Sequence, residues 1–364
     1  MNILLISREN FDFEGRLQEL CRVFSQLGRL YAFTLGSTPC WKDHAVCSLP
    51  CNGRHYLRFV RSAVSYGQSV GQVDLLVIDN TYAALPGMIL RRKLWPAMTV
   101  QDCPELYLTK YCTSFKSRTI CKLEQMSARR ADVVICANQE RAGMMEREFC
   151  LKRRPLVFEN VRQLSYSSDS APEEQEARFS GLLHDGELRI FSSDGWNLSR
   201  GTGDLIRALP RVGRKCRLYL AGAGSPDERQ AVESIVAEEG LENVELLGKL
   251  DHDALKYLIS VCHIGIVTYG RRTPNDLYCA SGKLYEFIYE GLPVVTTTNP
   301  PLKRLCDTYH IGVSDDGYSD GIREVAEQYE EYQQNVRSFA RTHTVEDNNA
   351  NLIQQLRERF FAIS

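Results

Sequence analysis

Residues 281–297 read SGKLYEFIYEGLPVVTT, and this segment holds the residue types best suited to binding a charged ligand. Its polar turn opens a short helix, and backbone amides at a helix N-terminus carry partial positive charge and bind phosphate groups. Ser281 and Gly282 stand at that N-terminus, and Lys283 adds a full positive charge beside them. Glu286 lies one turn further on the same face, where a carboxylate can accept both hydroxyls of a ribose. The segment therefore predicts a site for phosphate and ribose groups.

The same spacing also allows an interpretation without a ligand. Lys283 and Glu286 are three positions apart in a helix, so they could form an ordinary surface ion pair. Which interpretation holds depends on what lies opposite this helix end in the folded chain.

Short apolar runs alternate with helical patterns along most of the chain. Apolar stretches such as VDLLVID at residues 73–79 predict buried strands, and apolar positions such as Leu17, Leu20 and Phe24 predict a helix. This alternation is typical of βαβ units and a parallel sheet. The predicted strands are residues 2–7, 29–35, 73–79, 97–101, 132–137, 188–191, 217–221, 244–247, 263–268 and 293–297. The predicted helices are residues 14–27, 88–94, 115–130, 203–209, 227–239, 253–262, 284–289, 322–334 and 346–361.

The domain organisation follows from chain length and one interruption. Residues 163–183 are rich in Ser and Glu and low in hydrophobicity, which predicts a linker or an exposed excursion. At roughly 150 residues per domain, the 364 residues suggest two domains. We therefore expect an α/β protein with two Rossmann-like domains. The first is residues 1–165, the second is residues 166–344, and a last helix at 345–364 packs back on the first.

The segment 281–297 resembles the donor-site signature of the GT-B glycosyltransferases, especially the large retaining family 4, also called group 1. That signature places Ser-x-Lys-x-x-Glu and an aromatic residue ahead of Gly-x-Pro-Val. Other segments resemble the same family: residues 131–138 (ADVVICAN), 159–161 (ENV), 200–201 (RG), 218–224 (LYLAGAG), 248–250 (GKL) and 261–267 (VCHIGIV). Together these matches extend over most of residues 130–315.

The resemblance implies the GT-B fold, in which the two Rossmann-like domains face each other across a cleft. It also implies a nucleotide-sugar on the second domain and an acceptor on the first. It implies that positive groups stabilise a departing diphosphate, with Lys283 as the catalytic cation and Arg200 in place of the family's lysine. Retention of configuration at the sugar is the expected outcome. The donor-binding residues implied in this way are Arg200, Gly222, Gly224, Ser281, Gly282, Lys283, Leu284 and Glu286.

Three departures from the family pattern leave the donor and the stereochemistry open. Tyr278 stands where the family often has the first of two glutamates, and Asp276 is a candidate substitute. Residues 194–197 (DGWN) occupy the place of an arginine that flanks the diphosphate. In the first domain, Gln101 and Asp102 stand where a histidine is common.

The loop after the first strand, residues 9–15 (ENFDFEG), would contact the acceptor in such an enzyme. It contains one glycine, whereas a dinucleotide fingerprint needs Gly-x-Gly-x-x-Gly, so NAD binding is not expected. Asp12, Glu14 and Asp102 are candidates for a general base if the reaction inverts configuration. Helix capping or simple surface exposure is the alternative for each of these carboxylates.

The charge is unevenly distributed along the chain. Residues 1–165 hold 23 Lys and Arg against 15 Asp and Glu, although the whole chain has a formal net charge of -2. Basic runs at residues 91–93, 129–130 and 152–154 have apolar neighbours such as Trp95 and Leu151. This pattern predicts contact with an anionic membrane surface or a lipid-pyrophosphate acceptor. No recognised nucleic-acid-binding module is present, so nucleic acid is not an expected partner.

The cysteines and the apolar segments bear on localisation. The 13 cysteines are scattered without a Cys-x-x-Cys pair, and only Cys47 and Cys51 approach a metal-ligand spacing. Free thiols in a reducing cytoplasm are the expectation, with no metal site. The chain starts in an apolar strand without a basic signal region, and no stretch is long enough to cross a bilayer. A cytoplasmic protein, peripheral on the inner face of the membrane, is expected.

The sequence thus predicts a glycosyltransferase that moves a sugar from a nucleotide-diphosphate donor to a hydroxyl of a saccharide or lipid-linked saccharide. The expected donor is UDP- or GDP-linked, no metal cofactor is expected, and the expected pathway is cell-surface polysaccharide or lipopolysaccharide assembly. Two alternatives stay open. One is a catalytically inactive binding or scaffold subunit of the same fold, and the other is a nucleotide-sugar epimerase.

Overall fold

The computed structural model describes residues 1–36, 45–49, 55–166 and 172–361, and the chain divides into two compact units. Unit 1 comprises Met1–Asn160 and Glu346–Ser364, whereas unit 2 comprises Val161–Val345. The chain therefore passes into unit 2 a little before residue 165 and returns to unit 1 for its last helix.

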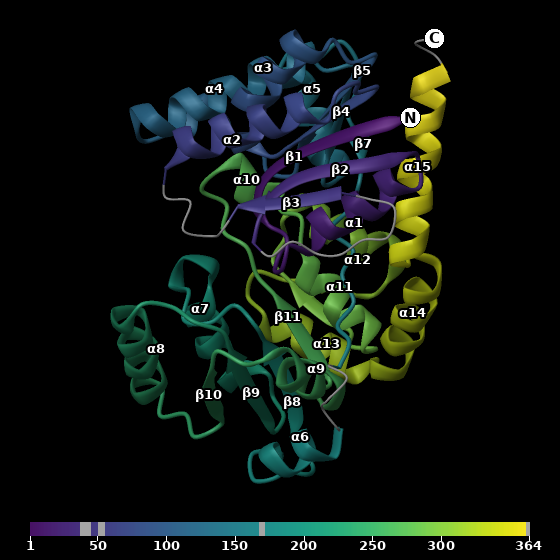
Figure 1. The fold of residues 1–364 in the computed structure, drawn as a ribbon. Helices are drawn as coiled ribbons and strands as arrows, with labels where there is room; N and C mark the ends of the chain where they lie inside the picture. Colours follow the sequence, from purple (N-terminus) through teal and green to yellow (C-terminus); the bar gives the residue numbers. More distant parts are fainter. Residues whose placement is uncertain (37–44, 50–54, 167–171, 362–364) are drawn as a thin grey trace. The chain divides into compact units, whose positions relative to one another are not determined.

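Unit 1 contains a seven-stranded parallel sheet with the order β3-β2-β1-β4-β5-β6-β7 (Figure 1). Its strands are β1 (Asn2–Asn10), β2 (Arg29–Leu35), β3 (Ala45–Leu49), β4 (Leu75–Asp79), β5 (Met98–Cys103), β6 (Val133–Cys136) and β7 (Leu156–Val157). Its helices are α1 (Gly15–Ser25), α2 (Tyr56–Ser69), α3 (Ala84–Leu94), α4 (Phe115–Arg130), α5 (Gln139–Glu148) and α15 (Val345–Phe361), with 3₁₀ turns η1 (Thr81–Ala83) and η2 (Thr109–Tyr111). The strand order reverses beside β1, which is the usual place for a ligand in an open parallel sheet.

Two hydrophobic cores cover the two faces of the unit 1 sheet. Side chains of β1 alternate between them, because successive residues of a strand point to opposite faces. Ile3 and Leu5 join the core of α1, which also receives Leu352 and Leu356 from α15. Leu4 and Ile6, which point to the other face of the sheet, belong to the core formed with α2. The amphipathic face of the last helix is thus buried within unit 1.

Unit 2 contains a six-stranded parallel sheet with the order β10-β9-β8-β11-β12-β13. Its strands are β8 (Leu188–Ser192), β9 (Cys216–Ala221), β10 (Val244–Gly248), β11 (Ile264–Val267), β12 (Val294–Thr296) and β13 (Gly312–Ser314). Its helices are α6 (Pro172–Phe179), α7 (Thr202–Ala208), α8 (Pro226–Glu238), α9 (His252–Val261), α10 (Pro274–Leu277), α11 (Gly282–Tyr289), α12 (Pro300–Tyr309), α13 (Ser319–Glu327) and α14 (Tyr329–Thr342), with 3₁₀ turns η3 (Leu198–Arg200) and η4 (Leu209–Arg211). Here the strand order reverses beside β8.

The prediction of a linker over residues 163–183 is wrong for part of that stretch. Residues 172–179 form α6, whose Phe179 stacks on Tyr257 of α9 with ring centroids 6.0 Å apart. Leu182 follows, and its carbonyl accepts a hydrogen bond from the Tyr219 hydroxyl at 2.8 Å. The segment has few apolar residues, so its sequence gave a weak helical signal, yet one buried aromatic ring attaches it to unit 2.

The predicted helix at residues 322–334 is also wrong, because it consists of two helices that meet at Gln328. Gln328 has φ −110° and ψ 29°, outside the helical range. Ile322 of α13 belongs to one core of unit 2, whereas Val336 and Phe339 of α14 belong to the other. Tyr332, near the start of α14, still belongs to the core of Ile322, so α14 itself passes from one core to the other.

Candidate functional site

Polar residues gather where the central strands of the unit 2 sheet end. Asp194 follows β8, Thr268 follows β11 and Thr297 follows β12. Because β8 and β11 are neighbours at the point where the strand order reverses, this edge is where a ligand of an open α/β sheet is expected. The N-terminus of α11 lies at the same edge, since Lys283 of its first turn reaches Asp194.

The N-terminus of α11 is built as the sequence suggests. Ser281 is the N-cap residue, and its Oγ accepts a hydrogen bond from the Leu284 amide at 3.3 Å. The Leu284 side chain is buried in the core of unit 2. In the described structure, Ser281 and Leu284 therefore fix the helix end, while Lys283 provides the charge.

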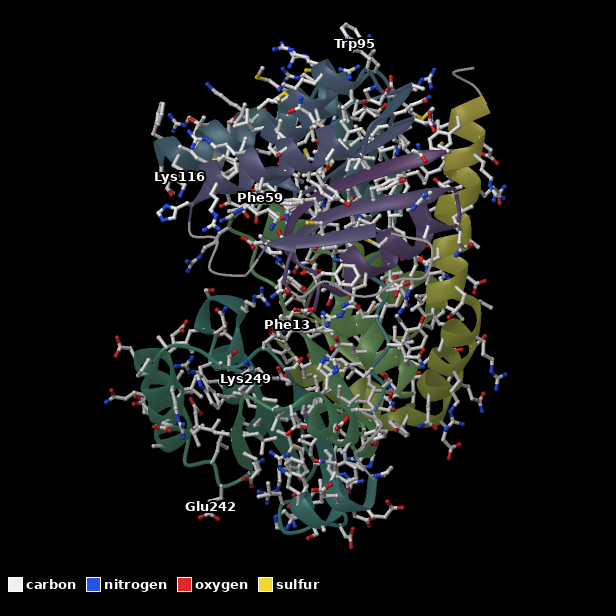
Figure 2. All side chains as sticks on the ribbon, in the orientation of Figure 1. Phe13, Phe59, Trp95, Lys116, Glu242 and Lys249 are labelled. Atoms are coloured by element: carbon white, nitrogen blue, oxygen red, sulfur yellow. The ribbon has the colours of Figure 1, made fainter. Side chains whose placement is uncertain are left out.

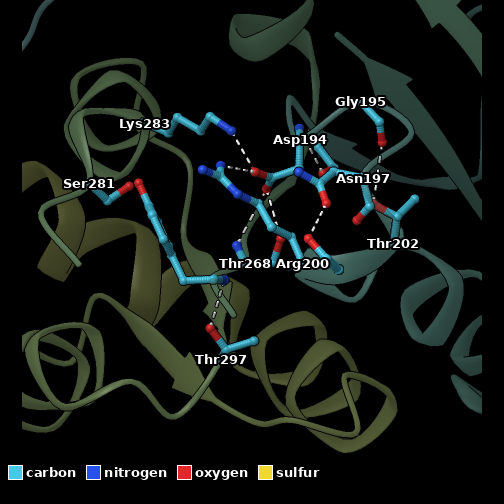
Figure 3. Close-up of polar contacts among 12 residues, drawn as sticks. Asp194, Gly195, Asn197, Arg200, Thr202, Thr268, Ser281, Lys283 and Thr297 are labelled. Atoms are coloured by element: carbon cyan, nitrogen blue, oxygen red, sulfur yellow. Dashed lines mark hydrogen bonds and ion pairs between the residues drawn. The ribbon is translucent and has the colours of Figure 1, made fainter. Parts of the chain in front are cut away.

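Asp194 lies between the two cations that the sequence assigned to diphosphate binding (Figure 3). Lys283 Nζ donates to Asp194 Oδ1 at 2.5 Å, and an Arg200 guanidinium nitrogen approaches the same oxygen at 3.2 Å. The Asp194 side chain is 1% exposed, whereas those of Lys283 and Arg200 are 24% and 36% exposed. The carboxylate is thus buried beneath two cations that solvent still reaches.

Asp194 and Arg200 have further contacts that hold them in place. The Thr268 hydroxyl donates to Asp194 Oδ2 at 2.9 Å. The Arg200 guanidinium lies over the ring of Tyr269, 4.9 Å from the ring centroid. Burial raises the pKa of the Tyr269 hydroxyl to about 12, so this tyrosine is neutral at physiological pH. The Tyr269 amide donates to Thr297 Oγ1 at 3.1 Å, which joins the ends of β11 and β12.

Lys283 and Glu286 do not form the surface pair that their spacing allowed. Lys283 pairs with Asp194, whereas Glu286 is buried and its Oε1 lies 3.4 Å from Nε of Arg162. Both side chains therefore have partners far away in the sequence. The helix presents a lysine and a carboxylate separately, as the ligand-binding interpretation requires.

Close packing explains why Gly222 and Gly224, which were predicted to bind the donor, have no side chain. Gly222 has φ +119°, and a Cβ on it would lie 2.8 Å from Cα of Gly195. A Cβ on Gly224 would lie 3.0 Å from side-chain atoms of Trp196. These positions let the loop after β9 approach the loop after β8, which carries Asp194. Their direct contact with a donor stays a prediction.

Asp276, the candidate substitute for the missing first glutamate, has a local structural role in the described structure. It completes a capping box at the start of α10, where its Oδ2 accepts hydrogen bonds from the Thr273 amide at 3.2 Å and hydroxyl at 2.7 Å. A carboxylate used in this way stabilises the helix end.

The three candidate bases of unit 1 lie in different environments. Asp12 and Glu14 are exposed in the loop that follows β1. Asp102 is fully buried, and its two oxygens accept hydrogen bonds from Arg16 at 2.7 and 3.0 Å. The same guanidinium donates to Asn160 Oδ1 at 2.9 Å. This geometry favours a structural ion pair for Asp102 over a general base, because neither carboxylate oxygen is available to a hydroxyl substrate.

Sequence analysis missed two buried carboxyl groups near Asp102. Asp79 ends β4 and lies in register with Ser7 of β1 and Asp102 of β5, and Ser7 Oγ is 2.5 Å from Asp79 Oδ2. Burial, and then the nearby Asp102, raise the pKa of Asp79 well above its ordinary value. Glu124 of α4 accepts a hydrogen bond from the Thr81 hydroxyl at 2.9 Å, and burial raises its pKa to about 8.

Signals for both groups were present in the sequence. Asp79 is the last residue of the VDLLVID run, and a polar residue at the carboxyl end of a buried strand marks the edge where ligands bind. Glu124 shares a helix face with Ile120 and Ala128, so its burial follows from helical spacing.

Metal and membrane features can be judged only within residues 1–36, 45–49, 55–166 and 172–361. There, no group of three His, Cys, Asp or Glu side chains lies close enough to hold a metal ion. In the same residues, no helix is both long and apolar enough to cross a membrane. The cysteines described there are free thiols, and most are buried. Cys51, half of the closest Cys pair, lies outside the described residues.

Comparison with known proteins identifies the class of unit 2. Residues 191–327 match the sequence family described as "Glycosyl transferases group 1". This segment contains Asp194, Arg200, Lys283 and Glu286. No curated protein matches the sequence.

The fold is shared with solved structures over the whole chain. Sucrose-phosphate synthase from Thermosynechococcus elongatus has a TM-score of 0.70 and 16% identity, covering 100% of both chains. HepE from Anabaena, solved in complex with UDP and glucose, has a TM-score of 0.72 and 16% identity, covering 98% of this chain and 100% of the other. UDP-GlcNAc 2-epimerase from Neisseria meningitidis has a TM-score of 0.61 and 10% identity, covering 100% of both chains.

These similarities establish the fold as GT-B, with two Rossmann-like units. The family match places residues 191–327 of unit 2 among the group 1 glycosyltransferases, as the resemblance predicted. Identities of 16% and below carry the fold alone, so the donor, the acceptor and the stereochemistry must be argued from this chain's own residues.

Proposed function

We propose that the protein transfers a sugar from a nucleotide-diphosphate donor to a hydroxyl group of a saccharide or lipid-linked saccharide. The observation that carries this proposal is the convergence of Lys283 and Arg200 at the carboxyl edge of the unit 2 sheet. Two half-exposed cations beside a helix N-terminus suit the phosphates of a nucleotide-sugar. The similarity to HepE, which was solved with UDP and with UDP-glucose, supports a UDP-linked donor, and a GDP-linked donor is the alternative.

In this proposal, the cations act on the leaving group. As the bond between the sugar and the diphosphate breaks, negative charge grows on the phosphate oxygen, and Lys283 and Arg200 stabilise it. These two side chains supply the positive charge from the protein itself, so we propose a transfer without a metal cofactor. Glu286, held near Arg162, would accept the ribose hydroxyls.

Asp194 gives this site a feature of its own. Before the donor binds, the carboxylate neutralises one of the two positive charges and holds both cations at the site. A diphosphate must therefore compete with Asp194 for Lys283 and Arg200. We propose that the cations turn from Asp194 toward the phosphates when the donor binds.

The acceptor and the pathway are proposed from the family match and from the charge of residues 1–165. The group 1 family match supports retention of configuration, and Asp12 or Glu14 would serve as the base if the reaction inverts. The basic character of residues 1–165 supports a phosphate-bearing, lipid-linked acceptor at an anionic membrane surface. We accordingly place the enzyme on the inner face of the membrane, in cell-surface polysaccharide or lipopolysaccharide assembly.

Ligand-induced thermal stabilisation tests the donor site, because a ligand that binds only the folded state raises Tm. Wild-type protein is compared with Lys283→Ala and Glu286→Ala in the presence of UDP, GDP, ADP, CMP and their common sugar conjugates. One nucleotide diphosphate should raise Tm in the wild type, and Lys283→Ala should weaken its binding about 10-fold to 100-fold. Lys303→Ala is the matched control, since Lys303 is exposed and pairs with Asp307 on α12.

The outcomes separate this function from its alternatives. If no nucleotide raises Tm, or if Lys283→Ala binds as well as wild type, the donor site is not where we place it. Donor binding without transfer to any acceptor would indicate a binding or scaffold subunit. Conversion of the nucleotide-sugar without an acceptor would indicate an epimerase, whose solved example shares the fold at a lower TM-score.

A further inference from the structure

Unit 1 has a concave surface at the amino ends of β6 and β7, away from the edge that holds Asp79 and Asp102. Its volume is about 490 Å³. The walls come from the last turns of α3 and α4, the loop before β7, and α15. We call this concavity the basic pocket, and its cationic residues are Arg91, Arg129, Arg130, Lys152, Arg153, Arg154 and Arg359.

The charges of the basic pocket are not balanced locally. Among the residues that the structure describes, none of its cations has a carboxylate within ion-pair distance. The one acidic residue in its lining is Asp132, whose Oδ2 accepts a hydrogen bond from the Thr99 amide at 2.8 Å. Protein surfaces usually intersperse charges of both signs, because like charges repel. A concavity lined in this way is therefore suited to an anion.

Several of these guanidinium groups are held in position by backbone carbonyls. Arg129 Nε donates to the Phe149 carbonyl at 2.6 Å, and a terminal nitrogen of Arg154 donates to the Gln139 carbonyl at 3.1 Å. These bonds use one donor of each group and leave others for a ligand. Because the side chains are already ordered, less conformational entropy is lost when an anion binds. Arginine also matches phosphate oxygens with two parallel N–H donors.

The helix dipole explains the positions of some of the pocket's cations but not of the others. Arg91, Arg129 and Arg130 lie in the last turns of α3 and α4, and Arg359 lies in the last turn of α15, where cations interact favourably with the helix dipole. Residues 152–154 lie in a loop and line the same concavity, so the dipole of a helix does not explain their positive charge. The loop therefore brings its cations to a place that is already positive.

An exposed aromatic residue follows α3, whose last turn carries Arg91 of the basic pocket. Trp95 is 84% exposed and follows the basic end of α3, with a left-handed backbone at φ 49°. Its indole points outward from unit 1 (Figure 2). Trp residues beside cations are typical of protein surfaces that contact lipid head groups.

We propose that the basic pocket binds a phosphate-bearing group of two or more negative charges, carried by a lipid head group or present as a free polyphosphate. This site refines the membrane contact of the proposed function and is separate from the donor site, which lies in unit 2. It would hold the enzyme, or its phosphorylated ligand, through unit 1 while unit 2 binds the donor.

Sedimentation of the full-length protein with lipid vesicles tests the lipid-borne form of the ligand. The vesicles contain phosphatidylcholine either alone or mixed with cardiolipin, whose head group carries two phosphates. The pocket variant is Arg130→Glu with Arg153→Glu and Arg154→Glu. The matched control reverses exposed cations of the same unit elsewhere, on α2 and α4: Arg58→Glu, Arg61→Glu and Lys122→Glu.

The wild type should bind the anionic vesicles and not the neutral ones. Since each basic residue near an anionic surface contributes about fivefold to partitioning, the pocket variant should bind about 100-fold more weakly. The control variant should keep most of its binding, although both variants change the net charge equally.

Calorimetric titration with inorganic tripolyphosphate tests the free form of the ligand. It uses the Lys283→Ala background, so that the donor-site lysine does not contribute. Binding of vesicles alone assigns the pocket to a lipid head group, and binding of tripolyphosphate alone assigns it to a free polyphosphate. Loss of binding to the same extent in both charge-reversal variants overturns the proposal. So does the absence of binding to both probes when the pocket residues are unchanged.

The donor and pocket proposals can fail independently. The pocket variant should keep the rise in Tm that a nucleotide produces in the wild type, because none of its substitutions lies in unit 2. Loss of vesicle binding with retained nucleotide binding therefore isolates the basic pocket. Nucleotide binding that is absent already in the wild type contradicts the donor site and leaves the pocket result intact.

Discussion

Asp79 of unit 1 and Asp194 of unit 2 occupy comparable places with opposite electrostatic surroundings. Each lies at the carboxyl edge of a parallel sheet, close to the point where the strand order reverses. Asp79 has Ser7 and Asp102 beside it, and burial raises its pKa. Asp194 is equally buried but contacts Lys283 and Arg200. The two edges therefore differ in charge because of the residues that helices and loops bring to them.

The difference shows where each unit can receive an anion. In unit 2, Lys283 and Arg200 lie at the carboxyl edge, where we propose that a diphosphate replaces the carboxylate of Asp194. In unit 1, the carboxyl edge has buried acids, and its buried arginines Arg16 and Arg141 are paired with Asp102 and Glu105. The cations that line the basic pocket, which have no carboxylate partner among the described residues, lie at the opposite, amino edge. Two units of the same architecture thus place their positive charge at opposite ends of the sheet.

The largest effect is expected from removing the charge of Asp102. Asp102→Asn leaves the buried Arg16 without its counter-ion, which should lower the free energy of unfolding by about 3–5 kcal/mol. Urea denaturation measures this loss, with the exposed Asp12→Asn as the control. Replacing the pair together, as Arg16→Met with Asp102→Leu, should recover much of the stability. A stable Asp102→Asn protein without transferase activity would instead make Asp102 the catalytic base.

An intermediate effect is expected from Glu124, and it depends on pH. Its folded-state pKa of about 8 lies above the ordinary value of 4.5, so folding takes up a proton between these values. The stability that the neutral group contributes is complete below pH 4.5 and is lost as the pH rises through 8. Glu124→Gln, which stays neutral, should therefore stabilise the protein at pH 8.5 by on the order of 2 kcal/mol.

Urea denaturation at pH 5 and pH 8.5 measures this difference between Glu124→Gln and the wild type. Glu148→Gln is the control, since Glu148 is an exposed residue that pairs with Lys110 at the surface. A stability difference that is the same at both pH values would show that Glu124 does not titrate in this range. The contrast between a buried carboxyl group without a cation in unit 1 and the ion-paired Asp194 of unit 2 would then not hold.

The smallest effect is expected from Asp194. Asp194→Asn removes the charge that competes with the diphosphate, so the nucleotide identified by the Tm measurements should bind up to about tenfold more tightly. Calorimetric titration measures the Kd. The control is Asp204→Asn on α7, since this exposed carboxylate lies near Arg207 on the surface. Weaker binding by Asp194→Asn would show that the carboxylate orients the cations and does not compete with the ligand.

The sequence predicted the parallel α/β architecture well because the signals are local. A buried strand is recognised from a short apolar run, and a helix from apolar residues at helical spacing, as in residues 73–79 and 115–130. Short elements with few apolar residues, such as α6, and the break at Gln328 gave little local signal. The formation of α6 and the break at Gln328 depend instead on how single side chains pack against one core or another.

By itself, the sequence determined the repeated strand–helix units and the capped helix that carries Lys283. Only the tertiary structure decided the partners of the charged residues. Lys283 pairs with a carboxylate 89 positions away, and Arg16 with one 86 positions away. Such pairs depend on which strands are neighbours in the sheet and on how deeply each group is buried. The same folding that made Asp102 an ion-pair partner placed Asp194 beside the two cations that we propose bind the diphosphate.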